Sequence, residues 1–156
     1  MPEVDTSALL KVPASDVFAL LAQVERNPEW VPRMVTSERL TSGPTVVGTR
    51  FRFALDLEFM GLVIDGVDEV VELVPDRFIR SRSVEGLLTY ISSWELEPVG
   101  EDGAATRVTY RMGFTLPPSL ERLATRFFNL DALTAAQAES GLQNLRRILE
   151  KGASDE

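Results

Sequence analysis

The chain contains neither cysteine nor histidine among its 156 residues. Without cysteine it forms no disulfide and has no thiol nucleophile. Without histidine it lacks the commonest general base and the commonest transition-metal ligand of proteins. The sequence also has no Gly-rich phosphate loop, no nucleophile elbow and no metal-ligand spacing. We therefore expect no metal site and no cofactor.

Basic residues and long apolar runs are also scarce. The 16 Lys and Arg residues stand against 24 Asp and Glu residues, which gives a formal net charge of −8. A nucleic acid would be repelled by most of such a surface, so no nucleic-acid partner is expected. No run of about 18 apolar residues occurs, and the N-terminal stretch MPEVDTSALLKV is not a signal peptide. We expect a cytoplasmic protein with no stable membrane insertion.

The length and the even composition predict one domain. A chain of this size can bury one sufficient core, and we find no linker, repeat or low-complexity tract. The domain is expected to span residues 1–151, and the last five residues, GASDE, are predicted to form a disordered tail. A monomer or a weak homodimer is expected.

Period-two alternation predicts most of the chain as strands. The cleanest strand covers 49–58, where one face carries Phe51, Phe53, Leu55 and Leu57 and the other carries Arg50, Arg52, Asp56 and Glu58. Strands are also predicted over 3–12, 35–41, 62–74, 78–84, 88–97 and 107–116. The alternation in 62–74 slips near Gly66, where we expect a bulge. The short turns between strands predict an antiparallel sheet.

Helical spacing appears in two places. Two short helices are predicted between the first strand and the second, the later one near Asn27-Pro28. From about Pro118 to Lys151, apolar residues recur at steps of three and four and predict one long helix. The predicted fold is α+β: a curved antiparallel sheet of six to seven strands that grips a long C-terminal helix.

Segments spread over the chain resemble a known superfamily. They are VPASDVFALL at 12–21, NPEWVP at 27–32, VGTRFRF at 47–53, VELVPDRFI at 71–79, WELEPVGEDGAATRVTYRM at 94–112 and NLRRILE at 144–150. The chain resembles the START-like, or SRPBCC, superfamily with its helix-grip fold, and within it the polyketide cyclase/dehydrase-like branch. The resemblance implies a cavity between the sheet, the C-terminal helix and the two short helices. It also implies a small hydrophobic ligand, such as a lipid, isoprenoid, polyketide or aromatic metabolite.

Inward-facing residues of the predicted elements are candidates for contact with such a ligand. Hydroxyls and an indole in an apolar pocket could orient a ligand, although the same side chains could simply pack a core. Trp30 could be a gate or a lid residue, and small residues midway along the long helix could leave room for the cavity. The candidates are Trp30, Phe51, Phe53, Leu55, Tyr90, Ser92, Trp94, Tyr110, Met112, Phe127, Gln137 and Gly141.

Catalysis is left open by the sequence. Asp65, Glu69 and Tyr110 are the candidate acid or base groups, and the two carboxylates share a strand face if no bulge separates them. A solvated outer face is the competing interpretation for both. Arg80 and Arg82 share a face and could hold an anionic group, or could point outward and pair with neighbouring acids. Ligand binding is the first hypothesis, a cyclase/dehydrase-type enzyme the second, and a protein-interaction module with an apolar outer sheet face the third.

Overall fold

A computed structural model describes residues 3–58 and 61–154. It contains seven strands, one 3-10 helix and three α-helices within these residues. In chain order they are β1 (Glu3–Leu10), α1 (Ala14–Leu21), η1 (Val24–Glu29), β2 (Met34–Arg39), β3 (Arg50–Leu57), β4 (Leu62–Val74), β5 (Phe78–Gly86), β6 (Thr89–Val99), β7 (Ala105–Thr115), α2 (Pro118–Phe127) and α3 (Leu130–Ser154).

The strands form a single antiparallel sheet in the order β1-β7-β6-β5-β4-β3-β2. Consecutive strands from β2 to β7 are neighbours, and β1 pairs with β7 to complete the far edge. Apolar residues of alternate positions are buried on one face, among them Phe51, Phe53, Trp94 and Met112. The predicted α+β helix-grip architecture is thereby confirmed, with seven strands.

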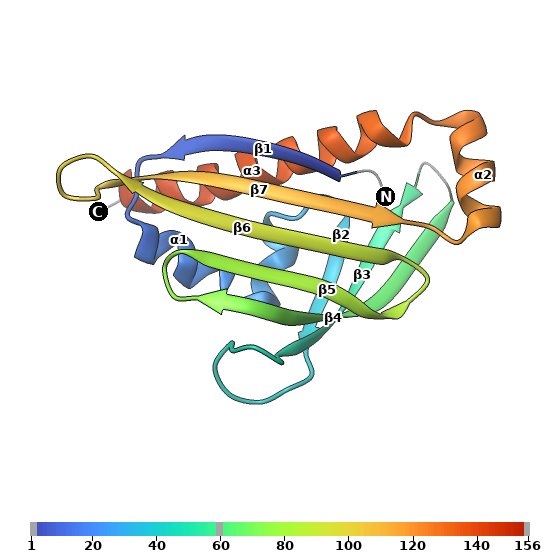
Figure 1. The fold of residues 1–156 in the computed structure, drawn as a ribbon, viewed down its shortest axis with the longest axis horizontal. Helices are drawn as coiled ribbons and strands as arrows, with labels where there is room; N and C mark the ends of the chain where they lie inside the picture. Colours follow the sequence, from blue (N-terminus) through green and yellow to red (C-terminus); the bar gives the residue numbers. More distant parts are fainter. Residues whose placement is uncertain (1–2, 59–60, 155–156) are drawn as a thin grey trace.

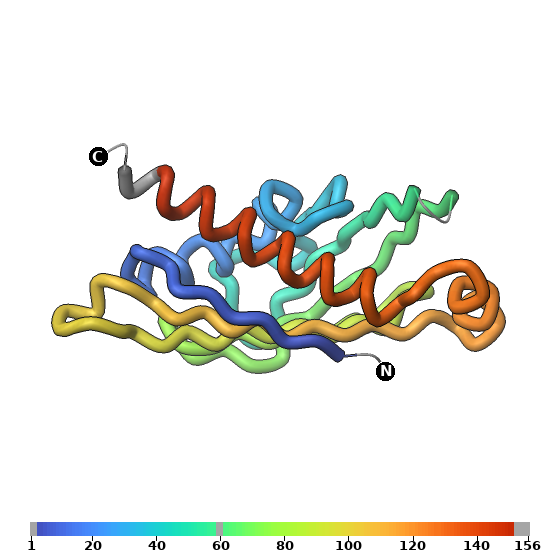
Figure 2. The backbone as a smooth tube through the Cα atoms, turned by 90° about the horizontal axis from the view of Figure 1, so that it is seen from above, coloured from blue at the N-terminus to red at the C-terminus, as the bar shows by residue number. Residues whose placement is uncertain are grey.

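The C-terminal helix lies across one face of this sheet (Figures 1 and 2). α3 packs against β1 and β7, α1 packs against β6, and η1 packs against β2. Together these helices cover the apolar inner face that the strand alternation creates. None of the helices within 3–58 and 61–154 is both long enough and apolar enough to cross a membrane.

The helical stretch predicted over 118–151 is divided in the structure. Phe128 has extended backbone angles and ends α2, and Asn129 caps α3 by accepting a hydrogen bond from the Ala132 amide at 3.1 Å. Asparagine is a strong N-cap because its side chain satisfies a free backbone N–H, and here that local preference interrupts the apolar spacing. α3 continues to Ser154, so three residues of the predicted disordered tail are helical, and 155–156 lie outside the described residues.

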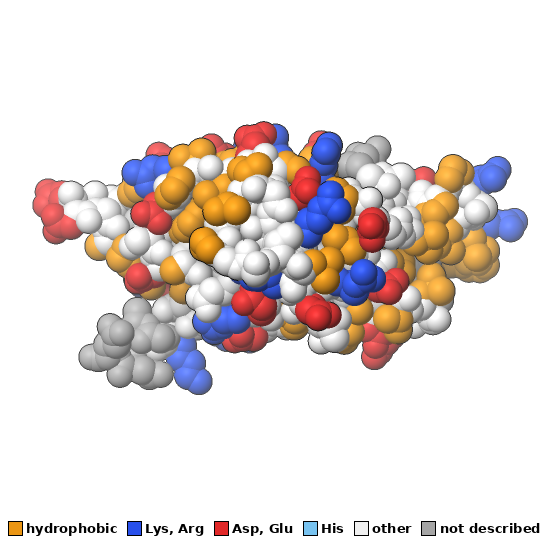
Figure 3. All heavy atoms as spheres, turned by 90° about the horizontal axis from the view of Figure 1, so that it is seen from below, with side chains coloured by type: hydrophobic (Ala, Val, Ile, Leu, Met, Phe, Trp, Pro, Cys, Tyr) orange, Lys and Arg blue, Asp and Glu red, His pale blue; other side chains and the backbone are white. Residues whose placement is uncertain are grey.

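The division leaves the apolar stripe of α2 partly uncovered. Leu123 and Phe127 belong to the predicted stripe, but their side chains are 55% and 71% exposed. Figure 3 shows hydrophobic side chains gathered at the end of the molecule where α2 lies. α2 therefore contributes less to the core than a continuous helix would.

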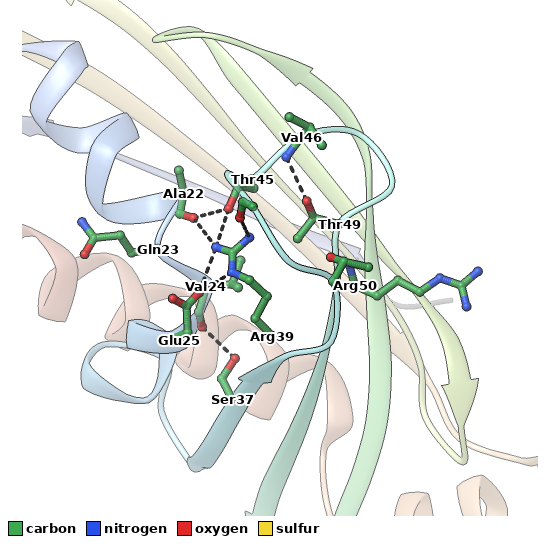
Figure 4. A network of polar contacts seen from close by, with 12 residues as sticks. Ala22, Gln23, Val24, Glu25, Ser37, Arg39, Thr45, Val46, Thr49 and Arg50 are labelled. Atoms are coloured by element: carbon green, nitrogen blue, oxygen red, sulfur yellow. Dashed lines mark hydrogen bonds and ion pairs between the residues drawn. The ribbon is translucent and has the colours of Figure 1, made fainter.

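The loop between β2 and β3 is fastened to the helices beside it by Arg39 (Figure 4). The Arg39 guanidinium donates to Glu25 Oε1 at 3.0 Å, to Thr45 Oγ1 at 2.7 Å and to the Gly43 carbonyl at 3.2 Å. Thr45 in turn donates to the carbonyl of Ala22 at the end of α1. Because a guanidinium presents several donors in a rigid plane, one side chain fixes this loop against α1 and η1.

Two bulges lie in the β4–β5 pairing, and the first begins after Val67, close to the slip predicted near Gly66. The register shifts between Val67 and Asp68 and again between Val70 and Glu72, while β4 passes Gly66 in regular register with β3. At Gly66 an added Cβ would approach the Glu85 carbonyl oxygen to 2.9 Å and the Phe53 ring to 3.1 Å. Gly66 thus serves close packing between neighbouring strands.

Candidate functional site

A cavity of about 280 Å³ lies between the inner sheet face and the N-terminal part of α3. β3, β6 and β7 form its floor, α3 covers it, and the segment between η1 and β2 closes one side. Most of its lining is apolar, which suits a hydrophobic ligand. The lining residues are Val31, Pro32, Arg33, Met34, Phe53, Leu55, Leu57, Asp68, Leu88, Tyr90, Met112, Phe114, Leu116, Leu130, Leu133, Ala136, Gln137 and Ser140.

Asp68 is the carboxyl group of this cavity. It pairs with Phe51 across β3 and β4, and directly opposed residues of an antiparallel pair point to the same face of the sheet. Its side chain therefore enters the apolar interior, where the residue is only 3% exposed. Its Oδ1 has no hydrogen-bond partner among the described residues. Burial disfavours the charged form and raises the pKa of Asp68 from 3.8 to about 7.

Two tyrosine hydroxyls lie near this carboxyl. The hydroxyls of Tyr90 and Tyr110 form a hydrogen bond of 3.0 Å between β6 and β7. Burial is the main cause that raises the pKa of Tyr110 to about 12, and the charge of Asp68 adds to it. Burial, followed by the charge of Tyr110, also raises the pKa of Tyr90. Both groups therefore remain neutral hydroxyls, able to donate and accept hydrogen bonds.

An aromatic cluster packs against the Tyr110 side of the tyrosine pair, in the core. The rings of Tyr110 and Trp94 stack at 3.9 Å between centroids, and Trp30 meets Trp94 edge-on at 5.0 Å. All three residues belong to the larger of the two buried clusters. This packing fixes the Tyr110 ring, and through the hydroxyl pair it orients Tyr90 at the cavity wall.

The segment 30–34 is tied to α3 by two amide side chains. Gln137 Nε2 donates to the Pro32 carbonyl at 2.6 Å, and Asn144 Nδ2 donates to the Trp30 carbonyl at 3.1 Å. Between these two bonds, an added Cβ at Gly141 would lie 3.4 Å from Pro32 Cδ, so the absence of a side chain permits the close approach. Ala136 and Ser140 line the cavity and are exposed, which places an opening on this side of α3.

The structure brings five of the predicted ligand contacts together at the cavity. They are Phe53, Leu55, Tyr90, Met112 and Gln137.

The other predicted contacts do not line the cavity. Trp30, Phe51, Trp94 and Tyr110 are buried in the larger core cluster, and Ser92 is half-buried beside them on β6. Phe127 is exposed on α2. The space beside Gly141 is occupied by Pro32.

The two carboxylates proposed as catalytic candidates lie away from the cavity. Asp65 is exposed, and Glu69 Oε1 accepts a hydrogen bond from Arg50 Nε at 2.9 Å, which forms an ion pair. Arg80 pairs with Glu72 at 2.8 Å, and Arg82 is exposed. All of these groups belong to the solvated face of the sheet.

Asp68 was not among the predicted site residues, although one feature of the sequence indicates its position. It has the same parity in its strand as Ile64 and Val70, both of which are buried. The prediction considered the opposite parity, with Asp65 and Glu69 as the candidate inward carboxylates, and so assigned Asp68 no role. A single acid at an apolar position of a strand is the pattern that identifies such a buried carboxyl.

The arrangement can hold an apolar molecule and direct one polar group toward Asp68 and Tyr90. A carboxyl with a pKa near 7 can also donate or accept a proton near neutral pH. Among residues 3–58 and 61–154, no group of three or more Asp or Glu side chains could hold a metal ion.

Comparison with solved structures shows the same fold in proteins of low sequence identity. TTHA0849 from Thermus thermophilus has a TM-score of 0.78 and 22% identity, over 97% of this chain and 99% of that one. The ZhuI aromatase/cyclase from Streptomyces sp. R1128 has a TM-score of 0.73 and 19% identity, over 96% and 93% of the two chains. A START superfamily protein from Mycobacterium smegmatis has a TM-score of 0.71 and 14% identity, over 96% and 97%.

Among curated proteins, none matches this sequence. The sequence pattern of one family, described as polyketide cyclase/dehydrase and lipid transport, matches residues 1–150, which is nearly the whole chain. The match agrees with the strand order, the gripped C-terminal helix and the apolar cavity beneath it. The chain therefore belongs to the polyketide cyclase/dehydrase and lipid transport family.

Proposed function

We propose that this protein binds and carries a small, mainly apolar ligand in the cavity under α3. The observation that carries the proposal is the cavity itself: about 280 Å³ with an apolar lining and one buried carboxyl that has an unpartnered oxygen. A domain that only needed a solid core would fill such a space, since interiors are close-packed and cavities destabilise the fold. The family's description includes lipid transport, which supports the same function.

The volume limits the size of an enclosed ligand. At the packing density of protein interiors, a cavity of this volume accommodates roughly 15 non-hydrogen atoms. A one- or two-ring aromatic compound or a short isoprenoid fits these limits. A longer molecule would have to extend through the opening beside Ala136 and Ser140.

Native mass spectrometry of the purified protein, followed by solvent extraction, tests this function. We expect a bound apolar compound, or uptake of compounds of this size from an apolar library. If the protein takes up none of them, and xenon or small aromatic probes also fail to enter the cavity, the carrier function is wrong.

A matched pair of variants on α3 locates the binding site. Ala136 lines the cavity and Ala135 does not, although both are exposed on the same helix. Ala136→Phe should obstruct the cavity and weaken ligand uptake by about tenfold or more, because a ring then competes for the same space. Ala135→Phe should leave uptake unchanged. Equal behaviour of the two variants would place binding elsewhere.

Asp68 supports an enzyme as the second candidate. In a cyclase/dehydrase-type reaction, the Asp68 carboxylate would remove a proton α to a ligand carbonyl, and the protonated carboxyl would return it to the departing hydroxyl as water forms. A carboxyl with a raised pKa near two neutral tyrosines is suited to such a transfer. The test is to incubate the protein with a small β-hydroxy ketone and to measure the loss of water from this compound by mass spectrometry. Asp68→Asn should abolish it and Asp65→Asn should not.

The outer face of the sheet gives little support to an interaction module. It carries ion pairs between neighbouring strands, including Arg50–Glu69, Arg80–Glu72 and Arg111–Glu95. An apolar docking patch would need such positions to be hydrophobic.

A further inference from the structure

The choice of a carboxyl at position 68 needs an explanation. A neutral polar side chain could hydrogen-bond an uncharged ligand without the cost of burying an ionisable group. A buried carboxyl has an advantage when it pairs with a cation or transfers a proton. The second case is the enzyme considered above, and the first is compatible with a carrier.

No cationic partner for Asp68 is found within the described residues. Asp68 takes part in none of the ion pairs of this part of the chain, and burial is the cause that shifts its pKa. The other ionisable groups that face the cavity or lie behind its wall are Tyr90, Tyr110 and Arg33. The residues of α3 that line the cavity are uncharged. Arg33 is an exposed residue of the η1–β2 segment, so solvent weakens its field.

We propose that the cavity binds a protonated amine on an apolar or aromatic body, with the ammonium group against Asp68 and the hydroxyl of Tyr90. This inference rests on the proposed carrier function and names its ligand class. An ammonium group would supply both the donor that Asp68 Oδ1 lacks and the opposite charge that stabilises a buried carboxylate. The body of the ligand would contact the apolar lining toward Leu116 and Leu130.

The aromatic lining favours the same chemistry. Phe53, Tyr90 and Phe114 line the cavity, and the faces of aromatic rings attract cations. Phe53 and Tyr90 lie 6.4 Å apart between ring centroids, so their rings border a shared space. A cation in this part of the cavity would therefore have both a counter-charge and ring faces around it.

Three indole compounds of similar size separate the possible ligand charges. They are tryptamine, which is cationic, tryptophol, which is neutral, and indole-3-propionate, which is anionic. Isothermal titration calorimetry at pH 8 should show that tryptamine binds at least about thirtyfold more tightly than tryptophol, the ratio expected for a buried charge pair. Indole-3-propionate should bind more weakly still, because its charge would oppose that of Asp68.

Asp68→Asn removes the charge with little change in shape. In this variant, tryptamine should lose its advantage over tryptophol, while tryptophol binding should change by less than about threefold. Asp65→Asn makes the same chemical change on the exposed face of β4 and should preserve the preference for the amine. The unchanged tryptophol affinity also shows that Asp68→Asn remains folded.

The pH dependence gives a second, independent readout. Tryptamine remains protonated from pH 5.5 to 8, whereas Asp68 changes its ionisation within this range. If only the carboxylate binds the amine, tryptamine affinity should fall by about 30-fold from pH 8 to pH 5.5, and tryptophol affinity should not fall.

Different results overturn the two proposals. If tryptophol or another apolar compound enters the cavity and tryptamine binds no better, the amine inference is wrong and the carrier function stands. Tighter binding of indole-3-propionate would likewise overturn it and would assign recognition to Arg33. If no apolar compound of any charge enters the cavity, the carrier function fails, and the amine inference fails with it.

Discussion

The two halves of α3 cover very different interiors. The C-terminal half, residues 141–154, places Leu142 and Leu145 in the larger core cluster, where both are fully buried. The N-terminal half, residues 130–140, covers the cavity with Leu130, Leu133, Ala136, Gln137 and Ser140. One helix thus provides a packed core at one end and the roof of a binding site at the other.

Small residues of α3 occur in both parts of this interface, since Ala136 and Ser140 line the cavity whereas others are packed. Thr134 and Ala138 are fully buried, the Thr134 hydroxyl donates to the Leu130 carbonyl at 2.7 Å, and Gly141 lets Pro32 approach. At these positions the neighbouring atoms fill the space around the helix. At the cavity, Ala136 and Ser140 stand beside the larger side chains of Leu130 and Leu133.

The largest effect that separates the two regions is expected from Asp68 at the hollow end. The pKa of Asp68 is about 7 in the folded protein, above its value of 3.8 in the unfolded chain. The stability that Asp68 contributes is therefore fully present below about pH 4 and is lost as pH rises through 7. A shift of about three pH units corresponds to on the order of 4 kcal/mol. Asp68→Asn should remove this loss, so the variant gains stability relative to the parent between pH 4 and pH 8. Urea unfolding at several pH values measures the difference.

Asp65→Asn is the control for this titration. The Asp65 side chain is exposed on the same strand, so its replacement should leave the pH profile of the free energy of unfolding unchanged. A parent profile that is flat between pH 4 and pH 8 would show that Asp68 does not titrate near 7, and it would remove the main electrostatic contrast between the two ends.

Leu142→Ala should destabilise the packed end by about 3 kcal/mol. The substitution leaves a void in a close-packed cluster that cannot fully collapse. Leu133→Ala, on the same helix, should cost less than about 1.5 kcal/mol, because Leu133 is half-buried and already borders an open space. Thermal or urea unfolding measures both values. Equal losses would mean that the two halves of α3 are packed alike and that the cavity is filled in solution.

The fold was predictable because its strands and helices follow from the spacing of apolar residues, which is visible in the sequence itself. The alternation of 49–58 identified Phe51, Phe53 and Leu55 as inward residues, and the structure buries all three. The short turns between consecutive strands indicated an antiparallel sheet, and the spacing after residue 118 identified the helical region. These features are local, and each element carries its own signal.

The site was predicted only in part because it depends on register between strands. The position of Asp68 follows from its pairing with Phe51 and from bulges against β5, and none of these is visible in one strand alone. The split between α2 and α3 followed from one capping residue, Asn129. Trp94 and Tyr110 face inward as expected, yet they stack on each other and so close the space they were expected to border.

Tyr110 of the packed core and Tyr90 of the cavity wall meet where the two regions join. Tyr110→Phe should lower the free energy of unfolding by about 1–2 kcal/mol. Removing its hydroxyl leaves the Tyr90 hydroxyl without its 3.0 Å partner in a buried place. The exposed pair of Ser7 and Thr109 hydroxyls, 3.2 Å apart between β1 and β7, gives the control. Ser7→Ala should cost less than about 0.5 kcal/mol, since water replaces the lost bond. Similar costs for the two variants would show that the tyrosine pair is hydrated and part of the open cavity.

Gln137→Ala should cost only about 1 kcal/mol of stability, but it should have a selective effect on the segment 30–34. The variant loses the bond to the Pro32 carbonyl, whereas the bond from Asn144 to Trp30 remains. Hydrogen exchange should therefore quicken within this segment and not in β1 or β7. Gln143→Ala, which removes only a long 3.4 Å contact with Glu139 on the helix surface, should change neither property. If Gln137→Ala left exchange in the segment unchanged while Asn144→Ala quickened it, the wall of the cavity would be held from the packed half of α3, and the two halves would act as one unit.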